Sequence, residues 1–520
     1  MNRKKLPIGI QTFAKIREEN CYYVDKTPLI EKLISQGSHY FLSRPRRFGK
    51  SLLIDTIGEL FAGNEPLFEG LYIYDKWDWD IKYPVIRISF GGGVVHDPEH
   101  LKRRIFTILE NNYHRLGIDF EDLDDAGDVF ESLILKLVAK TNQRVVILVD
   151  EYDKPILDNL HKPEIAREIR DGLRNLYSVI KDSDAHVKFA MLTGVSKFSK
   201  VSLFSGLNNL RDITINQEFS AICGYTDEDI DTVFAPEIGE LNREQIRHWY
   251  NGYNWTGKSV YNPFDVLLLF QDRIFKAHWF ETGSSTFLID LLAERGFFTP
   301  NLAAQQTDAD LLSTFDVELI SNEALLFQTG YLTISRVEEP LPNYWIYVLG
   351  YPNHEVESSL NSALLGAFGL NKQLALQNRL HLIPLLKNND FSKMQNLFTA
   401  FFASIPHDWY RNNPIAQYEG YYASVFYSYF AALGLEIILE DTTNHGRIDM
   451  TVKFNEQIYM FEFKVVEFVP EGKALQQLID RNYAAKYQAL NQPIHLIGVE
   501  FSKESRSVVG FEYLIGNTIY

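Results

Sequence analysis

The sequence predicts an α/β protein in three parts: a parallel sheet at the N-terminal end, a mainly helical middle region and a smaller α/β domain at the C-terminal end. First, residues ~20 to ~220 alternate short β-rich runs with helical stretches, as parallel sheets do. Second, residues ~225 to ~410 keep a helical spacing of apolar residues. Third, the pattern from residue ~414 onward reads helix, three strands, helix, two strands. The predicted domain boundaries are therefore 1–220, 221–410 and 411–520.

Five β-rich runs are expected to form the parallel sheet of the first part. The run Val145–Val149 is continuously apolar, as a strand buried on both faces should be. Between the runs, Ile165–Lys181 is a typical helix because its apolar residues fall on one face. The five predicted strands are Ser38–Ser43, Pro84–Phe90, Arg144–Asp150, Val187–Thr193 and Asp212–Asn216.

The middle region is expected to contain helices at Asp227–Phe234 and Asn242–Tyr250 and a short strand near Ser259–Tyr261. In the C-terminal part, Asn455-Glu456 is expected to form a tight hairpin turn. The elements predicted there are the helices Glu419–Leu433 and Glu471–Leu490 and the strands Leu435–Glu440, Arg447–Phe454, Gln457–Val466, His495–Phe501 and Ser507–Leu514.

Composition excludes several classes of protein. Hydrophobic residues make up 46% of the 520 residues, which is enough apolar surface to exclude disorder as the main state. No apolar run approaches the ~20 residues that span a bilayer, and no secretory signal is apparent, so we expect no membrane contact. Two cysteines exclude a disulfide scaffold and favour the reducing cytoplasm.

Charge is distributed unevenly along the chain. The net charge of −17 makes nonspecific coating of nucleic acid unfavourable. Residues 1–50, however, hold eleven Lys or Arg against four Asp or Glu. This basic segment suggests a site for a compact polyanion such as a nucleotide, and a solvated basic terminus is the alternative.

A Gly-Lys-Ser tripeptide follows the first predicted strand and precedes a predicted helix. This is the order of a phosphate-binding loop, in which backbone N–H groups and a helix N-terminus hold the phosphates. Lys50 is expected to reach the β- and γ-phosphates, and Ser51 to ligate Mg²⁺. The standard spacing places another glycine at position 44, where this chain has Arg44.

An acidic pair closes the apolar run of the third predicted strand. Asp150 at the carboxyl end of this strand can hold Mg²⁺, and Glu151 can orient or deprotonate an attacking water. Thr193 ends the next strand and is a candidate sensor of the γ-phosphate. Alternatively, the acids only cap a strand. Arg170 and Arg174 are candidate arginine fingers, although a solvated helix face is the favoured explanation for them.

A second group of charged residues lies on the predicted C-terminal hairpin. Asp449 is on one strand, while Glu462 and Lys464 share one face of the other because side chains alternate along a strand. Two carboxylates can hold a divalent metal, and a lysine can stabilise developing phosphorane charge. The alternative is an ordinary surface cluster. Further candidates for this site are Glu419, Gln477 and Arg481.

On these motifs the chain resembles an AAA-ATPase-like family whose members carry a C-terminal domain of the PD-(D/E)XK nuclease superfamily. Arg44 is similar to that family's own variant of the phosphate loop. Ile448 stands where the nuclease superfamily usually has proline. The matching segments are Tyr23–Thr27, Arg44–Ser51, Val149–Asp153, Tyr250–Tyr253, Gly446–Asp449 and Phe461–Lys464.

The resemblance implies a P-loop NTPase sheet that binds ATP and Mg²⁺, joined to a restriction-endonuclease-like α/β domain. It implies ATP hydrolysis and metal-dependent cleavage of DNA or RNA. The catalytic residues would be Glu151, Asp449, Glu462 and Lys464. The nucleotide-binding residues would be Arg47, Gly49, Lys50, Ser51, Asp150 and Thr193, and the metal ligands Ser51, Asp150, Asp449 and Glu462.

Two functions remain open from the sequence. The first is an ATP-regulated nuclease, and the second is a nucleotide-dependent switch whose nuclease-like domain is inactive and binds a partner. Residues 414–520 hold 13 Asp or Glu and 8 Lys or Arg, and this acidic balance opposes contact with a polyanion without forbidding it. No Gly-x-Ser-x-Gly elbow occurs, which disfavours an esterase. A homo-oligomer or a protein partner also stays open.

Overall fold

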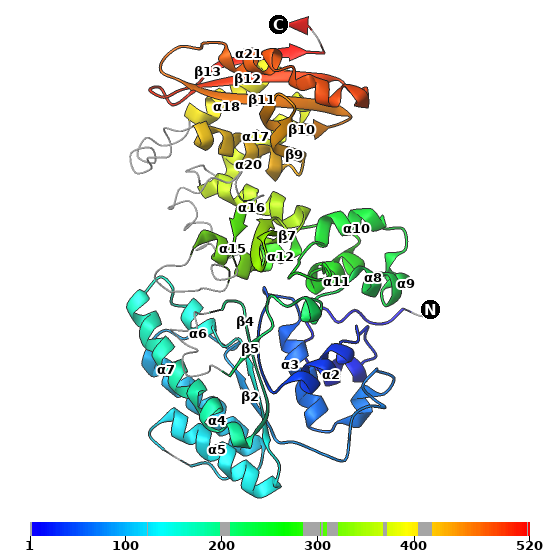
Figure 1. Cartoon of the computed structure of the whole chain (residues 1–520), viewed down its shortest axis with the longest axis vertical. Coiled ribbons are helices and arrows are strands. Elements are labelled where there is room, and N and C mark those ends of the chain that lie inside the picture. The colour runs from blue at the N-terminus through cyan, green and yellow to red at the C-terminus, as the bar shows by residue number, and fades with distance from the viewer. Residues whose placement is uncertain are drawn as a thin grey trace. The chain divides into compact units, whose positions relative to one another are not determined.

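We describe a computed structural model of the chain (Figure 1). The structure describes residues 3–121, 123–197, 209–283, 302, 305–308, 312, 321–367, 372–403, 419–516 and 518–519. The chain forms two compact units. The first comprises residues 1–283 and 304–353, and the second comprises residues 284–303 and 354–520.

The first unit is built around a five-stranded sheet in the order β2-β3-β4-β1-β5. Every pairing in this sheet is parallel, which confirms the parallel sheet that the sequence predicts. Because β4 is inserted between β1 and β3, the strand before the Gly-Lys-Ser loop and the strand before the acidic pair are not neighbours. The strands are β1 (His39–Ser43), β2 (Val85–Ser89), β3 (Val145–Asp150), β4 (Val187–Gly194) and β5 (Arg211–Asp212).

β5 is shorter than the predicted run Asp212–Asn216. The Asp212 carboxylate accepts a hydrogen bond from the Thr214 N–H at 2.8 Å, and this local bond turns the chain out of the extended conformation. Thr214 then contacts β1 through its side chain, because its hydroxyl oxygen accepts the Ser43 N–H at 3.0 Å. The prediction is therefore right in place and wrong in length.

Helices cover both faces of the parallel sheet (Figure 1). Both β1 and β3 are buried along their whole length, as their apolar sequences require. α7 presents the apolar face that its sequence spacing predicts, and that face is buried. The helices here are α1 (Phe13–Glu18), α2 (Thr27–Gln36), α3 (Lys50–Phe61), α4 (Pro98–Arg115), α5 (Ala126–Thr141), α6 (Lys154–Leu157) and α7 (Pro163–Asp182).

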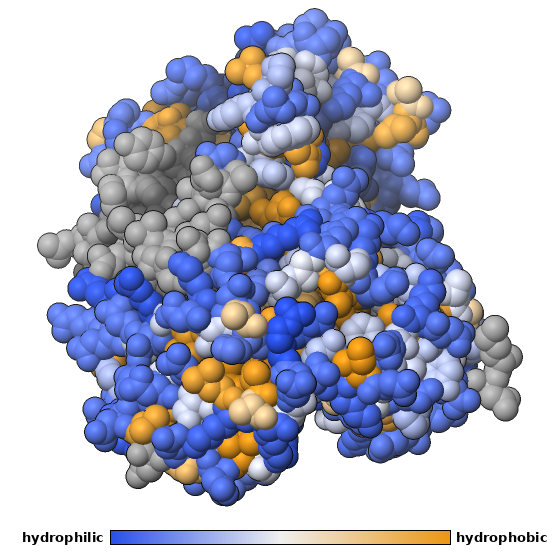
Figure 2. Space-filling view, turned by 60° about the horizontal axis from the view of Figure 1, so that its bottom comes forward, coloured by the Kyte–Doolittle hydropathy of each residue, from blue (hydrophilic) through white to orange (hydrophobic). Residues whose placement is uncertain are grey.

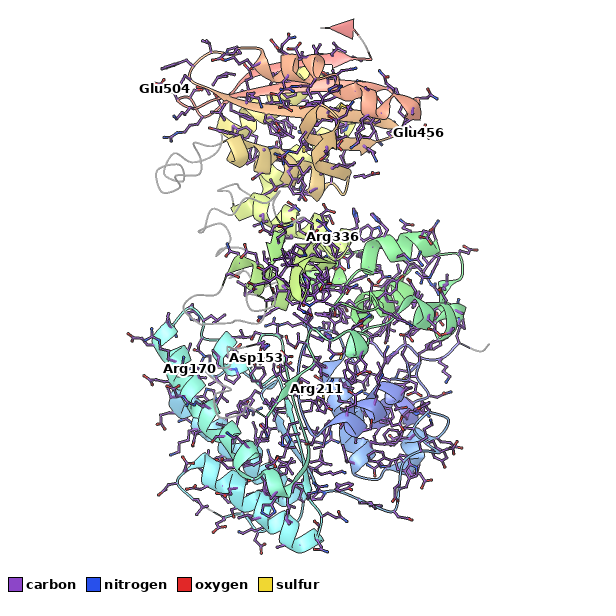
Figure 3. The ribbon with its side chains drawn as sticks, in the orientation of Figure 1. Asp153, Arg170, Arg211, Arg336, Glu456 and Glu504 are labelled. Atoms are coloured by element: carbon purple, nitrogen blue, oxygen red, sulfur yellow. The ribbon has the colours of Figure 1, made fainter. Side chains whose placement is uncertain are left out.

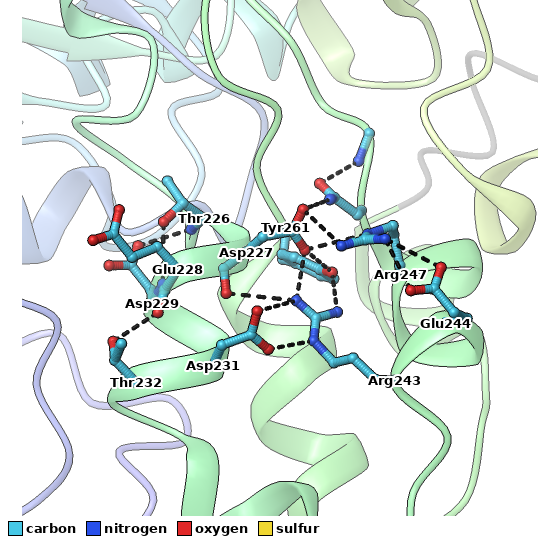
Figure 4. A network of polar contacts seen from close by, with 12 residues as sticks. Thr226, Asp227, Glu228, Asp229, Asp231, Thr232, Arg243, Glu244, Arg247 and Tyr261 are labelled. Carbon is cyan, nitrogen blue, oxygen red and sulfur yellow. Dashed lines mark hydrogen bonds and ion pairs between the residues drawn. The ribbon is translucent and has the colours of Figure 1, made fainter.

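Short helices follow the parallel sheet, and a polar network joins two of them (Figure 4). Arg243 donates hydrogen bonds to Asp227, Asp231 and the Tyr261 hydroxyl, each at 2.6 Å. The guanidinium also lies 5.5 Å from the centroid of the Tyr261 ring. The helices of this part are α8 (Asp227–Thr232), α9 (Ala235–Ile238), α10 (Arg243–Tyr250), α11 (Pro263–Asp272), α12 (His278–Gly283) and α15 (Asn322–Thr329).

The expectation of a mostly helical middle region misses a small antiparallel sheet. β6 (Gln305–Thr307), β7 (Thr333–Leu341) and β8 (Tyr344–Gly350) pair in the order β6-β8-β7. Two register shifts interrupt the pairing of β7 with β8, and the outer half of β7 is largely exposed, so its sequence lacks the alternation of a half-buried strand. The strand predicted near Ser259–Tyr261 is present only as isolated bridges to Tyr253 and Tyr225.

The second unit contains a six-stranded sheet in the order β14-β13-β12-β11-β10-β9. β11 and β12 are parallel, and the other pairings are antiparallel. The strands are β9 (Glu436–Thr443), β10 (Gly446–Phe454), β11 (Gln457–Val466), β12 (Ile494–Ser502), β13 (Val508–Ile515) and β14 (Thr518–Ile519). The helices are α16 (His354–Ala367), α17 (Lys372–Lys387), α18 (Phe391–Ala403), α20 (Glu419–Ala432) and α21 (Lys473–Asp480).

The helix predicted over 471–490 is broken in two. α21 ends at Asp480, Asn482 has a left-handed φ of 47°, and a 3₁₀ helix covers Tyr483–Leu490. This break lets two adjacent side chains, Lys486 and Tyr487, both hydrogen-bond the buried Asp441 carboxylate of β9. A tertiary contact therefore overrides the helical periodicity of the segment.

Polar side chains dominate the visible surface, and apolar ones gather there in small patches (Figure 2). Within the described ranges, no helix is long and apolar enough to cross a bilayer.

Candidate functional site

The Gly-Lys-Ser loop connects β1 to α3 as the sequence predicts. Gly49 precedes α3 with a left-handed φ of 91°, a conformation that favours glycine. Arg47 is also left-handed, with a φ of 69°. No side chain caps the N-terminus of α3, so its first N–H groups and the positive end of the helix dipole are available for an anion.

Lys50 lies beneath this loop rather than on the surface. Its side chain is buried, and the ammonium donates hydrogen bonds to the carbonyls of Arg44 at 2.8 Å and Pro45 at 2.9 Å. Burial lowers the pKa of the Lys50 ammonium, while the charge of Asp150 opposes that shift. The lysine is therefore held beneath the loop by two main-chain carbonyls of the loop itself.

Asp150 and Thr193 meet across neighbouring strands. The Thr193 hydroxyl donates to the Asp150 carboxylate at 2.7 Å, and the Glu151 N–H donates to the same carboxylate oxygen at 3.1 Å. Thr193 is fully buried. The Thr193 hydroxyl is thus directed at Asp150, so its geometry is that of a residue that orients the acid.

Two further acids follow Asp150 and line a cavity. Glu151 has a left-handed φ of 52°, and burial, together with the charge of Asp150, raises the pKa of its carboxyl. Asp153 accepts the N–H groups of Val195 at 3.0 Å and Ser196 at 2.6 Å, and burial raises its pKa. Our sequence analysis missed Asp153 as a site residue, although it stands in the same Val-Asp-Glu-Tyr-Asp run.

The cavity that these acids line has a volume of about 490 Å³. The loop residues from Arg46 to Ser51 line it and supply cationic and main-chain groups. Other walls are apolar and aromatic, and they were not identified from the sequence because they come from distant segments. These walls include Tyr22, Tyr23, Val24, Tyr225, Phe264 and Leu267.

The predicted arginines fall in different places. Arg47 is exposed at the cavity, and its guanidinium lies 4.8 Å from the centroid of the Phe264 ring. Arg170, on α7 (Figure 3), donates to its neighbour Asp171 at 3.1 Å, and Arg174 is exposed on the same helix. Neither Arg170 nor Arg174 lines the cavity within this chain.

In the second unit, Asp449 and Glu462 lie where β10 and β11 stop pairing. The last paired residues of the two strands are Met450 and Phe461, and each is the sequence neighbour of one of the acids. Asp449 accepts the Phe463 N–H at 2.8 Å, so the carboxylate takes up a main-chain donor that the ladder has released. The separation of the strands brings the two predicted acids to one place.

Glu462 is 1% exposed and has two unlike oxygen atoms. Oε1 accepts a hydrogen bond from the Lys464 ammonium at 3.0 Å and another from the Gln477 side-chain amide. The first contact confirms that Glu462 and Lys464 share a face of β11. Oε2 is buried and has no hydrogen-bond partner among the described residues. Burial, together with the charge of Asp449, raises the pKa of Glu462 to about 7. A buried, unpaired carboxylate oxygen beside a second acid is the donor arrangement that a divalent cation would satisfy.

The two carboxylates fit Mg²⁺ better than a metal that needs a full protein cage. Over the described ranges, no three His, Cys, Asp or Glu gather as a metal site. Mg²⁺ is often held by one or two carboxylates, with water and substrate phosphates filling its other positions. In the first unit, Ser51 and Asp150 are donors of the same oxygen type.

Of the other candidates predicted around Glu462, one contacts it and one does not. Gln477 of α21 contacts Glu462, whereas Arg481 donates to the His445 carbonyl at 3.3 Å. The Glu419 side chain lies outside the described residues. Sequence reasoning missed Glu500, which is buried on β12 and accepts the N–H groups of residues 471–474. Glu500 thereby fixes the start of α21 and, through it, the position of Gln477.

Among solved structures, the chain is similar to two proteins of Aeropyrum pernix. One is the ORC2 protein in ADPNP–ADP complexes, at 11% identity and a TM-score of 0.25, covering 66% of this chain and 92% of that one. The other is the ORC1 protein in complex with DNA, at 13% identity and a TM-score of 0.26, covering 67% of this chain and 95% of that one.

The family of the chain follows from sequence matches. Residues 7–204 match the family model described as "Predicted AAA-ATPase", and residues 417–511 match that of the PD-(D/E)XK nuclease superfamily. An Azotobacter chroococcum mcd 1 protein, described as "Uncharacterized protein in vnfD 5'region", is 64% identical over 512 residues, which are 98% of this chain and 99% of that protein. The chain therefore belongs to one family with this Azotobacter protein, and it joins an AAA-ATPase-like domain to a domain of the PD-(D/E)XK nuclease superfamily.

Proposed function

We propose that the first unit binds and hydrolyses ATP and that the second unit cleaves nucleic acid with the help of Mg²⁺. The observation that carries the proposal is that Gly49, Lys50 and Ser51 meet Glu151 and Asp153 around one cavity. Because Cys21 and Cys223 are free thiols, we further propose that the protein works in the reducing cytoplasm.

The shape and charge of the cavity support a nucleoside triphosphate as its ligand. A volume of about 490 Å³ suits such a molecule. The uncapped start of α3 and the Lys50 ammonium would hold the phosphates, and the aromatic walls would contact the base and sugar. Ser51 and Asp150 would hold Mg²⁺, which would neutralise phosphate charge when bound.

Glu151 is the proposed base for hydrolysis. Its carboxyl lines the cavity, and its raised pKa brings it closer to the range in which a carboxylate accepts a proton efficiently near neutral pH. Asp150 is oriented by Thr193 and sits beside Glu151, so the two adjacent acids would have separate tasks.

The nuclease proposal rests on Asp449, Glu462 and Lys464. The two carboxylates would hold a cation that polarises a phosphodiester and lowers the pKa of a water molecule. The Lys464 ammonium, 3.0 Å from Glu462, would stabilise negative charge that develops on the phosphate.

A second candidate function is a nucleotide-dependent switch whose nuclease-like domain binds a partner without cleaving anything. Its support is that Glu462 Oε1 already receives hydrogen bonds from Lys464 and Gln477. An acidic surrounding chain also repels a polyanion. The partner would be another protein or a second copy of this chain.

Replacing Lys50 by alanine should weaken ATP binding by at least roughly tenfold, since a charged hydrogen bond is worth about 1.5–3 kcal/mol. Isothermal calorimetry measures the affinity, and circular dichroism checks the fold. Lys140→Ala is the matched control, because that ammonium also donates to two main-chain carbonyls, Leu116 and Gly117, away from the loop. Equal ATP affinity of K50A and wild type would exclude the phosphate-loop assignment.

Glu151→Gln should keep ATP affinity near that of wild type and slow phosphate release by roughly 10²-fold or more, because an amide cannot accept a proton from water. A coupled assay of phosphate release gives the rate. The control is Glu168→Gln, which changes an exposed acid on α7. If E151Q hydrolyses ATP at the wild-type rate, Glu151 has only a structural role.

Glu462 also predicts how the stability of the metal-free protein varies with pH. The folded pKa of about 7 lies above the ordinary value of 4.5, so the native state holds this proton more tightly than the unfolded state does. Ionisation of Glu462 therefore lowers the free energy of unfolding as pH rises from about 4.5 to about 7. At pH 8 with a chelator, Glu462→Gln should be more stable than wild type by an amount on the order of 1–3 kcal/mol.

Calorimetric unfolding at pH 5, 6, 7 and 8 measures this difference. Adding Mg²⁺ or Mn²⁺ at pH 8 should raise the melting temperature of wild type and leave that of E462Q unchanged. Glu440→Gln, at an exposed acid paired with Arg447, controls for net charge. A metal-free E462Q that is less stable than wild type at pH 8 would contradict the raised pKa.

The nuclease proposal predicts that Asp449→Ala and Glu462→Ala each abolish metal-dependent cleavage, because one remaining acid would hold the cation more weakly and would not fix it against the phosphodiester. Lys464→Ala should slow cleavage and leave metal binding largely intact. The assay covers single- and double-stranded DNA and RNA with Mg²⁺ or Mn²⁺, with and without ATP.

Glu456→Ala is the control for the cleavage assay. Glu456 lies in the β10–β11 turn, where the ladder between these strands begins, whereas Asp449 and Glu462 lie where the ladder ends. Figure 3 shows this turn at the end of the sheet opposite the β12–β13 turn that carries Glu504. If wild type cleaves none of these nucleic acids, the partner-binding switch replaces the nuclease proposal.

A further inference from the structure

Arg44 is a buried cation inside the phosphate loop. The residue is 1% exposed and is not among the residues that line the cavity beside the loop. One guanidinium nitrogen donates to the carbonyls of Ser43 at 2.8 Å and Thr214 at 2.9 Å, and another donates to the Phe219 carbonyl at 3.4 Å. The side chain thereby joins the end of β1 to the segment that follows β5.

Aromatic rings from a distant segment cover this arginine. The guanidinium carbon lies 3.9 Å from the centroid of the Trp255 ring, a close cation–π contact in a desolvated place. Trp255 in turn meets Phe48 of the loop edge to face at 5.5 Å, and Tyr253 meets Phe48 at 4.6 Å. Burial lowers the pKa of Arg44 to about 10, so the guanidinium stays charged at neutral pH.

Four main-chain carbonyls of the loop accept hydrogen bonds. The Lys50 ammonium donates to the carbonyls of Arg44 and Pro45. The indole N–H of Trp279 donates to the Arg46 carbonyl at 3.1 Å. The Gly224 N–H donates to the Phe48 carbonyl at 3.2 Å. Trp255 and Trp279 come from a segment about two hundred residues after the loop. The main-chain conformation of the loop is thus fixed by Lys50 of the loop itself and by residues outside it.

Position 44 also has no need of glycine. Arg44 is absent from the residues with positive φ, whereas Arg47 and Gly49 have left-handed values. The missing glycine of the standard spacing is therefore replaced by a residue of ordinary backbone conformation whose side chain acts on the inner side of the loop.

We propose that Arg44 is a positioning residue of the nucleotide site: its guanidinium, stacked on Trp255, holds the phosphate loop from behind in its anion-binding conformation. The inference rests on the proposed ATP binding for its functional consequence. It identifies residues that never touch the nucleotide and yet set the affinity for it, because a loop that is already ordered loses less entropy on binding.

Lysine cannot replace arginine in this role. The three donors of an ammonium lie around one nitrogen, so they do not match three carbonyls that are spaced for a planar guanidinium. An ammonium also does not stack on an indole as a guanidinium does. Glycine restores the standard spacing of the loop but removes every contact to Thr214, Phe219 and Trp255. Both substitutions should leave the fold of the sheet in place and loosen the loop.

The test measures two quantities in the full chain: amide hydrogen exchange of residues 44–51 without nucleotide, and ATP affinity by calorimetry. Both are measured at a temperature where circular dichroism finds each variant folded. Arg44→Lys, Arg44→Gly and Trp255→Leu should each speed exchange in the loop and weaken ATP binding by roughly tenfold or more, the loss expected for one charge-assisted contact set. Exchange in β1 and β4 should change much less than exchange in the loop.

Arg243→Lys is the matched control, because Arg243 also donates several hydrogen bonds and lies over an aromatic ring but does not line the cavity (Figure 4). It should lower the melting temperature and leave loop exchange and ATP affinity unchanged. Wild-type exchange and affinity in R44K and R44G would overturn the proposal, and so would a uniform rise in exchange across the sheet. If wild type binds no ATP, the proposed function fails, while the exchange data still decide whether Arg44 orders the loop.

Discussion

The insertion of β4 between β1 and β3 is the constraint on which the nucleotide site depends. Neighbouring strands lie about 4.8 Å apart, so the strand that ends in the phosphate loop and the strand that ends in the acids are separated by roughly 10 Å. In the proposed function, the phosphates and the cation would lie between these two strand ends. Thr193 stands at the end of the intervening strand and fixes Asp150 across the gap.

In the second unit, the acids come together because two neighbouring strands separate, and not because a strand is inserted between them. Where β10 and β11 stop pairing, Asp449 takes up a released main-chain N–H and comes beside Glu462. Burial of Glu462, together with the charge of the half-buried Asp449 beside it, raises the pKa of the Glu462 carboxyl. The first unit thus places carboxylates at the end of a strand, and the second places them inside two strands at the point where these stop pairing with each other.

Much of this arrangement could be predicted from the sequence, for physical reasons. Strands such as β3 are continuous apolar runs because both faces are buried, and the Gly49–Ser51 loop is a local motif with a fixed order. The β7–β8 hairpin escaped because its outer strand is exposed and irregular. The inward direction of Arg44 and the role of Glu500 escaped because each depends on partners far away in the sequence, and no local pattern records such contacts.

The stacking of Trp255 on Arg44 has a consequence for how such a chain changes in evolution. The match to the ATPase family model ends at residue 204, before either tryptophan that holds the loop. A substitution at position 44 alters the surroundings of position 255, and the reverse is equally true. If Arg44 orders the loop as proposed, the two positions are under a joint constraint, and the ATPase segment keeps its loop conformation only together with the segment that carries Trp255 and Trp279.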